Sequence, residues 1–429
     1  MHMNSRSTRI IPHWLRHVWL VALAPCAFST HAQVATPGST QAPAAAYSLK
    51  QAFDAAWSRQ PEALALPSRR EAAMADQQAA LAWTPAPLAL QVSEKSDRLN
   101  RNRGSRELEV GVVVPLWLPD ERSRSNALAS AQVAAVESRA TAAQLRISGI
   151  LRPLWWQWQR DQVDADMARD QLTSAQRLAG DVSRRLHAGD LARADQHQAD
   201  GAVAAAESAL ALAQARLVAS LHQLVAHIGS ASIALQTPVA AAESTPDDGP
   251  ADVDGHALVL ALKDQATVAE RTASLATAQS RGHPELLLAT TRERAAFGET
   301  NQQTITLGVR VTFGDGARFA ARTATALADA AEAQAQLALE RQRVLSEREA
   351  HRSQVAGARV QLAAAERRAQ LARESRSFFD KSFRLGETDL PTRLRIEAEA
   401  ADAERQAARG RIDLAAAISA WRQSLGLLP

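Results

Sequence analysis

Histidine is the residue type that most readily suggests chemistry in this sequence, because its imidazole binds metal ions and transfers protons near neutral pH. Four histidines share one stretch at intervals of 10, 25 and 5 residues: His187, His197, His222 and His227. These intervals, without supporting carboxylates or thiols, do not match a metal-ligand spacing. The sequence also carries no nucleophile–base set, phosphate loop or nucleotide fingerprint. We therefore expect no catalytic residue, no metal site and no cofactor, and we predict that the protein is not an enzyme.

Two short segments combine glycine with charged residues. They are Arg185-Leu186-His187-Ala188-Gly189-Asp190 and Arg384-Leu385-Gly386-Glu387-Thr388-Asp389. Glycine suits the left-handed residue that ends a helix. An acidic or hydroxyl residue just after it caps the next helix. Each segment is therefore predicted to reverse the chain between two helices.

The second half of the chain repeats the first at a shift of 197 residues. Pro87 recurs as Pro284, Gly111 as Gly308, Gly189 as Gly386 and Gly229 as Gly426, with a one-residue slip near residue 120. We predict one structural unit used twice. The first repeat covers 47–230, a polar linker covers 231–256, and the second repeat covers 257–429.

The N-terminal residues have the pattern of an export signal. A basic start, the apolar stretch 18–28 and the small-x-small end Thr30-His31-Ala32 predict a signal peptide over 1–32, followed by a flexible leader over 33–46. Without the three arginines of this signal, the chain has 46 basic and 46 acidic residues, which gives no indication of a nucleic-acid partner. Cys26, the only cysteine, is either removed with the signal or lipidated; Pro25 before it favours removal.

Long helices dominate the predicted secondary structure. We expect short helices from Ser48 to about 61 and over 68–83, rods over 120–185 and 317–384, and return helices over 191–228 and 390–425. Each rod of about 65 residues would be roughly 100 Å long. Pro153 is expected to kink or interrupt the first rod, with Trp155, Trp156 and Trp158 packing there. The mature sequence is interpreted as having no stretch of about 20 apolar residues, so no membrane-spanning helix is expected.

Each repeat also contains one predicted β-hairpin, over 87–116 and 284–313. One face of the second strand is apolar (Leu108, Val110, Val112, Val114, Leu116), and the equivalent face in the second repeat is Ile305, Leu307, Val309, Val311 and Phe313. Alternation over about ten residues is typical of a lipid-facing barrel strand. Trp83, Trp117 and Phe313 lie at the helix-proximal ends, where an aromatic belt at a membrane interface would lie. The alternative is a half-buried strand of a soluble domain.

Four strands are too few to close a barrel, which needs about eight or more. Open edges in lipid would leave backbone groups unpaired, so several copies must share one barrel. The predicted fold class is mainly α with a small β part: duplicated long-helix hairpins form an α-barrel, and four strands per chain contribute to a shared transmembrane β-barrel.

This order of elements resembles the TolC-like outer-membrane efflux proteins over essentially the whole mature chain. The similarity includes the opening Ser48-Leu49-Lys50-Gln51-Ala52, both tips, and the closing segments Leu224 to Gly229 and Trp421 to Gly426. It implies a homotrimer in the outer membrane that extends into the periplasm and works with a periplasmic membrane-fusion adaptor and an inner-membrane proton-driven transporter. The run Phe383-Arg384-Leu385-Gly386-Glu387-Thr388-Asp389-Leu390-Pro391-Thr392, with Gly-Glu-x-Asp-Leu at its centre, is most similar to the heavy-metal (cobalt–zinc–cadmium type) efflux branch.

The resemblance implies roles for the two tips. Gly189, Asp190, Gly386 and Glu387 would meet the adaptor, and Arg185, Arg384 and Asp389 would form gate ion pairs. The alternative is that the glycines only end helices and the charges are only solvated. Two further functions stay open: a duct for small organic compounds or type I secretion, and a periplasmic helical adaptor or structural rod.

Overall fold

The computed structural model describes residues 48–229, 242–247, 252–314 and 316–429. All of them belong to one compact unit, Ala46–Pro429. The expected signal peptide, the flexible leader, Cys26 and most of the linker lie outside the described residues.

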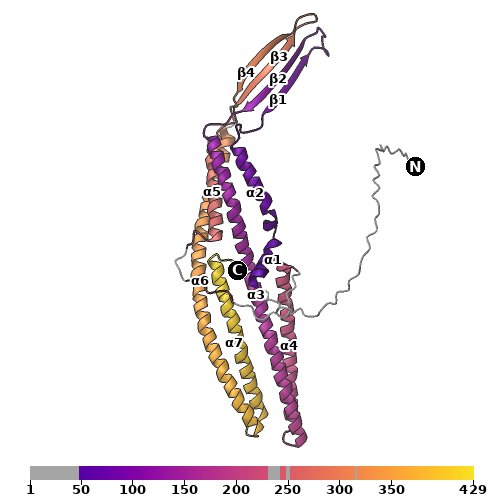
Figure 1. Cartoon of the computed structure of the whole chain (residues 1–429), viewed down its shortest axis with the longest axis vertical. Helices are drawn as coiled ribbons and strands as arrows, with labels where there is room; N and C mark the ends of the chain where they lie inside the picture. The colour runs from indigo at the N-terminus through magenta and orange to yellow at the C-terminus, as the bar shows by residue number, and fades with distance from the viewer. Residues whose placement is uncertain (1–47, 230–241, 248–251, 315) are drawn as a thin grey trace, which may run out of the picture. The chain divides into compact units, whose positions relative to one another are not determined.

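Two successive sets of helices and strands follow each other along the chain (Figure 1). The first set is α1 (Leu49–Ser58), α2 (Pro61–Ala80), β1 (Ala89–Ser96), β2 (Arg106–Pro115), α3 (Glu121–Ala188) and α4 (Arg193–Ile228). The second is α5 (Ala257–Ala278), β3 (Glu285–Arg294), β4 (Gln302–Arg310), α6 (Gly316–Arg384) and α7 (Leu390–Ser424). The predicted class, long helices with a small four-stranded sheet, is confirmed.

The start of the fold differs in one respect from the prediction. Ser48 caps α1 as expected, because its Oγ accepts a hydrogen bond from the Gln51 N–H while the Gln51 side chain accepts from the Ser48 N–H. The next helix was expected from residue 68, but α2 begins at Pro61 and contains Pro67. Proline at the first helical position loses no intrahelical hydrogen bond. Pro61 therefore begins α2, whereas the prediction used it only to mark the end of the preceding helix.

The two rods α3 and α6 have 68 and 69 residues, about 100 Å each. α4 packs along α3, and α7 packs along α6. Pro153 lies inside α3 without interrupting it, so that part of the prediction is wrong. Trp155, Trp156 and Trp158 are buried against α1 and α4, through residues such as Phe53 and Leu224. This confirms that the tryptophans pack, and the packing explains why the helix continues through a proline.

The strands form one antiparallel sheet in the order β1-β2-β3-β4. Leu90 is opposite Val112, Val112 is opposite Leu288, and Leu288 is opposite Leu307. Directly opposed residues share a face, so this row places apolar side chains on one face of all four strands. The opposite face carries ion pairs such as Lys95–Glu107 at 3.0 Å and Arg310–Glu285 at 3.0 Å. The predicted apolar alternation of β2 and β4 is confirmed.

α4 corrects another expectation. By length and composition this helix is apolar enough to cross a bilayer, and only 6% of its most apolar window is buried within the chain. The expectation that no such segment exists is wrong on composition. Alanines supply much of this apolar character, and α4 packs lengthwise on α3. Composition alone therefore does not place α4 in lipid.

Candidate functional site: two helical tips and an open sheet

The first tip, between α3 and α4, is closed by Gly189. Its φ is +86°, and the N–H groups of Gly189 and Asp190 donate to the carbonyl oxygens of Leu186 (3.0 Å) and Arg185 (2.9 Å). This pair of backbone hydrogen bonds ends a helix with a residue in the left-handed conformation, which glycine adopts without strain. Asp190 does not cap α4, contrary to the expectation for the residue after the glycine. The N-cap is Ala192, whose N–H donates to the Asp195 carboxylate at 2.9 Å.

The second tip, between α6 and α7, has the same backbone. Gly386 has φ +81°, and the Glu387 N–H donates to the Ser382 carbonyl at 3.0 Å. Asp389 caps α7 by accepting from the Thr392 N–H at 3.2 Å. Hydrogen bonding by Thr392 holds the pKa of the Asp389 carboxyl below its ordinary value. Apart from the residues directly before and after each glycine, the described chain has no atom within 4 Å of the space that a Cβ at Gly189 or Gly386 would fill, so both turns have open surroundings.

Arg185 joins the two tips. Its guanidinium donates to the carbonyl oxygens of Phe383 (2.9 Å) and Arg384 (2.7 Å), the last residues of α6. It also lies 4.9 Å from the centre of the Phe383 ring, a cation–π distance. Helix C-termini carry unpaired carbonyls and partial negative charge, so a cation donated from another helix stabilises this end.

This arrangement differs from the expected gate ion pairs. Within the described residues, Arg185 reaches the second hairpin through carbonyls, Arg384 pairs with Asp380 of its own helix, and Asp389 acts as a helix cap. Interhelical ion pairs between α6 and α7 near this tip include Arg393–Asp380 at 2.7 Å and Arg376–Glu397 at 3.6 Å. Sequence reasoning assigned no contact to Phe383, which begins the run 383–392, or to Arg393. Phe383 stands three residues before Gly386, and its burial is the signal that sequence alone did not give.

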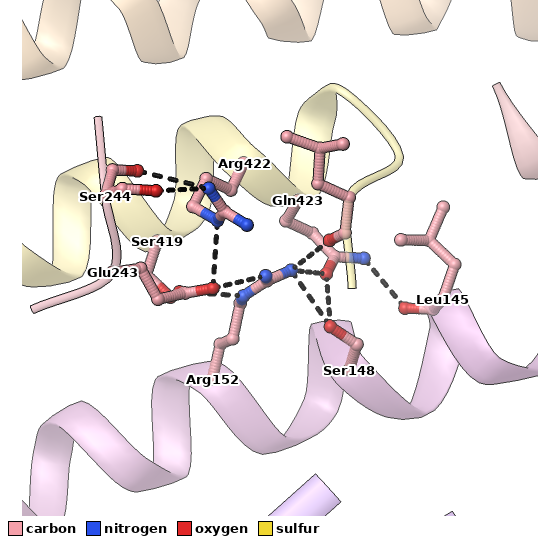
Figure 2. Close-up of polar contacts among 9 residues, drawn as sticks. Leu145, Ser148, Arg152, Glu243, Ser244, Ser419, Arg422 and Gln423 are labelled. Carbon is pink, nitrogen blue, oxygen red and sulfur yellow. Dashed lines mark hydrogen bonds and ion pairs between the residues drawn. The ribbon is translucent and has the colours of Figure 1, made fainter. Parts of the chain in front are cut away.

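A buried polar cluster joins the two repeats farther along α3 (Figure 2). The Arg152 guanidinium contacts the Glu243 carboxylate through two hydrogen bonds, of 2.8 and 3.3 Å. Arg152 also donates to Ser148 Oγ at 2.9 Å and to the Leu427 carbonyl at 3.0 Å. From α7, Ser419 and Arg422 also donate to Glu243. One carboxylate of the segment between the repeats thus binds α3 and α7 together.

The seam between α3 and α7 continues toward the tips. Arg160 of α3 pairs with Asp413 of α7 at 2.8 Å, and Asp164 of α3 pairs with Arg409 of α7 at 2.5 Å. Asp164 and Arg409 also line a groove of about 430 Å³ bounded by α3, α4 and α7. The helix pair α3–α4 and the helix pair α6–α7 are therefore held to each other by ion pairs at several positions along α3 and α7.

The junction of sheet and helices contains a buried carboxylate. Glu121, at the start of α3, is 1% exposed and accepts from the Leu118 N–H (3.0 Å), the Gln279 amide (2.6 Å) and the His283 ring (2.8 Å). Burial alone would raise the pKa of Glu121, but these hydrogen bonds outweigh it and leave the pKa below its ordinary value. The Trp117 ring meets His283 edge-on at 6.5 Å.

The three predicted interfacial aromatic residues lie at this junction. Trp117 donates its indole N–H to the Ala82 carbonyl at 3.2 Å, while Trp83 and Phe313 are 93% and 85% exposed. Among the described residues, no group of three or more His, Cys, Asp or Glu is arranged to hold a metal ion. His187 instead contacts the Ser183 carbonyl at 2.6 Å.

This fold is that of the outer-membrane channel proteins. No protein-family model matches the sequence, and no curated protein matches it. Among solved structures, 23 chains match. The outer membrane protein VceC of Vibrio cholerae aligns with TM-score 0.70 and 17% identity over 88% of this chain and 96% of its own. CusC aligns with TM-score 0.72 and 15% identity (89% and 93%), and the outer-membrane channel OprN with 0.71 and 19% (88% and 89%).

Proposed function

We propose that this protein is the outer-membrane exit duct of a tripartite efflux pump and passively conducts its cargo from the periplasm to the exterior. The observation that carries the proposal is the sheet: four strands crossed on one face by apolar rows such as Leu90–Val112–Leu288–Leu307, and joined by short loops to two helices of 68 and 69 residues. An apolar outer face suits lipid. The likeness to outer-membrane channels of solved structure supports the same location.

The assembly we propose is a homotrimer. Four strands per chain leave the sheet open, and three copies supply 12 strands, which is within the size range of membrane barrels. The long helices of three copies then surround a periplasmic conduit. Its remaining partners are a periplasmic membrane-fusion adaptor, an inner-membrane proton-driven transporter and the lipid of the outer membrane.

The tips are the proposed docking and gating sites. Gly189, Asp190, Gly386 and Glu387 are exposed at the two turns between the long helices, where an adaptor can bind end to end. Arg185 holds the closed tip by joining the first hairpin to the carbonyl end of α6. Opening then requires that these two charged hydrogen bonds break.

The cargo we propose is heavy-metal cations, on the strength of the run Gly386 to Leu390. A duct conducts ions best when it binds them weakly, so the lack of a metal-ligand spacing in the sequence agrees with this role. Small organic compounds or a secreted protein are the alternative cargo, because the inner-membrane transporter selects what enters the duct.

Membrane extraction together with a resistance assay tests this function. The full-length protein should fractionate with the outer membrane as a heat-sensitive oligomer in detergent, and loss of its gene should sensitise cells to cobalt, zinc or cadmium. Sensitivity to organic compounds alone would replace the metal cargo with the alternative. A periplasmic monomer that does not bind the outer membrane would contradict the duct and favour the adaptor or rod.

Gly386→Pro tests the docking site. Proline fixes φ near −65°, which the +81° of Gly386 cannot accommodate, so the tip backbone must change while the open surroundings leave the rest intact. We expect export to be abolished while the folded trimer remains in the outer membrane. Gly298→Pro is the matched control, because Gly298 has φ +84° with equally open surroundings in the β3–β4 turn. Normal export by Gly386→Pro would contradict docking.

A further inference from the structure

The sheet has two outer strands that pair on one side only within the described chain. β1 pairs with β2, and β4 pairs with β3. A strand edge exposed in hydrocarbon leaves its N–H and C=O groups unpaired, so each edge needs another strand. If the proposed duct is correct, that strand belongs to a second copy, and the internal repeat determines which residues meet.

The repeat relates β2 to β4 by the shift of 197 residues, which places Gly111 on Gly308 and Val110 on Leu307. The partner of Val110 in β1 is Val92, and the partner of Leu307 in β3 is Leu288. β1 therefore corresponds to β3 at a shift of 196, not 197. The sequence match of Pro87 with Pro284, at a shift of 197, therefore differs by one residue from the shift that the strand pairing gives for β1 and β3. The offset has a physical reason: it keeps the apolar residues of both strands on one face.

The pairing of β2 with β3 inside the chain predicts the pairing between copies. Val110 is opposite Thr290. By the repeat, Val110 of β2 corresponds to Leu307 of β4, and Thr290 of β3 corresponds to Glu94 of β1. We propose that β4 of one copy pairs antiparallel with β1 of a second copy, in the register that sets Leu307 opposite Glu94 of the second copy. The same register sets Thr306 opposite Lys95 of the second copy and Val309 opposite Val92 of the second copy.

The chemistry of the two edges fits this register toward the helix-proximal end of the sheet. Nearer the β1–β2 turn the register sets Leu307 opposite Glu94, whose carboxylate lies on the same face as Val92 and pairs with Arg106 at 2.8 Å. Val309 and Val92 are both exposed apolar residues, 67% and 60% exposed in the single chain, and they meet on the apolar face. Thr306 and Lys95 meet on the polar face. A slip of one residue would place Val309 opposite Gln91 or Ser93 and bring a polar side chain into lipid along the whole edge.

The register also gives a closed barrel a normal tilt. Val92 of β1 is opposite Val110 of β2, which is opposite Thr290 of β3. Thr290 corresponds by the repeat to Glu94, two residues beyond Val92. A step from β1 to β3, across two strands, therefore moves the paired position along the chain by two residues. The paired position thus moves by one residue, about 3.4 Å, for each neighbouring strand, and neighbouring strands are about 4.8 Å apart. This ratio corresponds to strands tilted by about 35° from the barrel axis. Tilts of roughly 35–45° are typical of membrane barrels. The proposed contact continues the same advance without a break.

Cysteine cross-linking of the full-length protein in native outer membrane tests the register. In the double variant Thr306→Cys/Lys95→Cys, directly opposed Cα atoms fall within disulfide range, so oxidation should give covalent dimers and trimers. Pairs displaced by two residues, Thr306→Cys/Ser93→Cys and Thr306→Cys/Asp97→Cys, should cross-link on the order of tenfold less. Lys95→Cys/Glu107→Cys, an opposed pair within one chain, should oxidise without a change in chain number. Single variants control for Cys26.

The outcomes separate the register from the function. Dimers and trimers that form mainly with the Lys95→Cys pair support the proposal. If a displaced pair dominates while the unoxidised variants still form a heat-sensitive oligomer and export cargo, the register is wrong and the duct stands. If no pair links separate chains and the protein is monomeric, both the register and the proposed function fail.

Discussion

The buried cluster around Arg152 and Glu243 offers a quantitative test of what holds the two repeats together. Arg152 and Glu243 have side chains that are 3% and 12% exposed, and their guanidinium and carboxylate make two hydrogen bonds. Glu243→Ala leaves the Arg152 cation buried without its carboxylate. Removing one member of a buried pair costs about 3–5 kcal/mol. Because Ser148 and the Leu427 carbonyl still accept from Arg152, we expect the lower end, about 3 kcal/mol.

The matched control is an exposed pair with the same chemistry. Arg70 and Glu137 also form a bidentate contact, at 2.5 and 2.6 Å, but their side chains are 45% and 53% exposed. Solvent screens such a pair, so Glu137→Ala should cost less than about 1 kcal/mol. Both variants remove one glutamate from a two-point contact with an arginine. Glu243→Ala also removes the acceptor of Ser419 and Arg422, so the comparison sets a buried carboxylate with several donors against an exposed carboxylate paired with one arginine.

The measurement is thermal unfolding of the purified oligomer, followed by circular dichroism. For the unit Ala46–Pro429, an unfolding entropy of about 2.1 cal/mol/K per residue converts 3 kcal/mol into a fall in Tm of about 4 °C. Glu137→Ala should lower Tm by about 1 °C or less. Equal shifts for the two variants would refute the argument that burial makes the Glu243 contact the stronger one. The double variant Glu243→Ala/Arg152→Met should regain stability, because it removes the buried unpaired charge.

Two further predictions concern the tip and the sheet–helix junction. On the proposed gating role, Arg185→Ala removes two charged hydrogen bonds that together contribute about 3 kcal/mol, so the open fraction should rise on the order of 100-fold. Single-channel recordings measure this rise as open probability. Arg185→Lys should restore the low open fraction only in part, and an unchanged open probability would contradict the bridge to α6. Because the folded pKa of Glu121 lies below its ordinary value of 4.5, its contribution to stability is present above about pH 4.5 and is lost as the pH falls through the folded pKa. Glu121→Gln should therefore be less stable at neutral pH and lose less stability on acidification; acid unfolding with a slope equal to that of the unchanged protein would contradict this.

The sequence by itself determined the helices, the strands and the turns between them. Gly189 and Gly386 predicted the left-handed ends of the two rods, and alternation along residues 107–116 predicted the apolar face of β2, because these signals are local to the backbone. The sequence also predicted that the three tryptophans after Pro153 would pack. It could not show that this packing preserves a continuous helix, because the compensating contacts come from α1 and α4.

Only the tertiary structure decided which distant groups meet. Arg185 was expected to pair with carboxylates, yet it donates to carbonyl oxygens almost 200 residues away. Glu243 lies in a segment that the sequence identified only as a polar linker, and its three partners come from α3 and α7. The one-residue difference between the two hairpins became visible only through the strand register. Local propensity fixes each element, whereas a contact between remote residues depends on how whole helices pack, which no short stretch of sequence encodes.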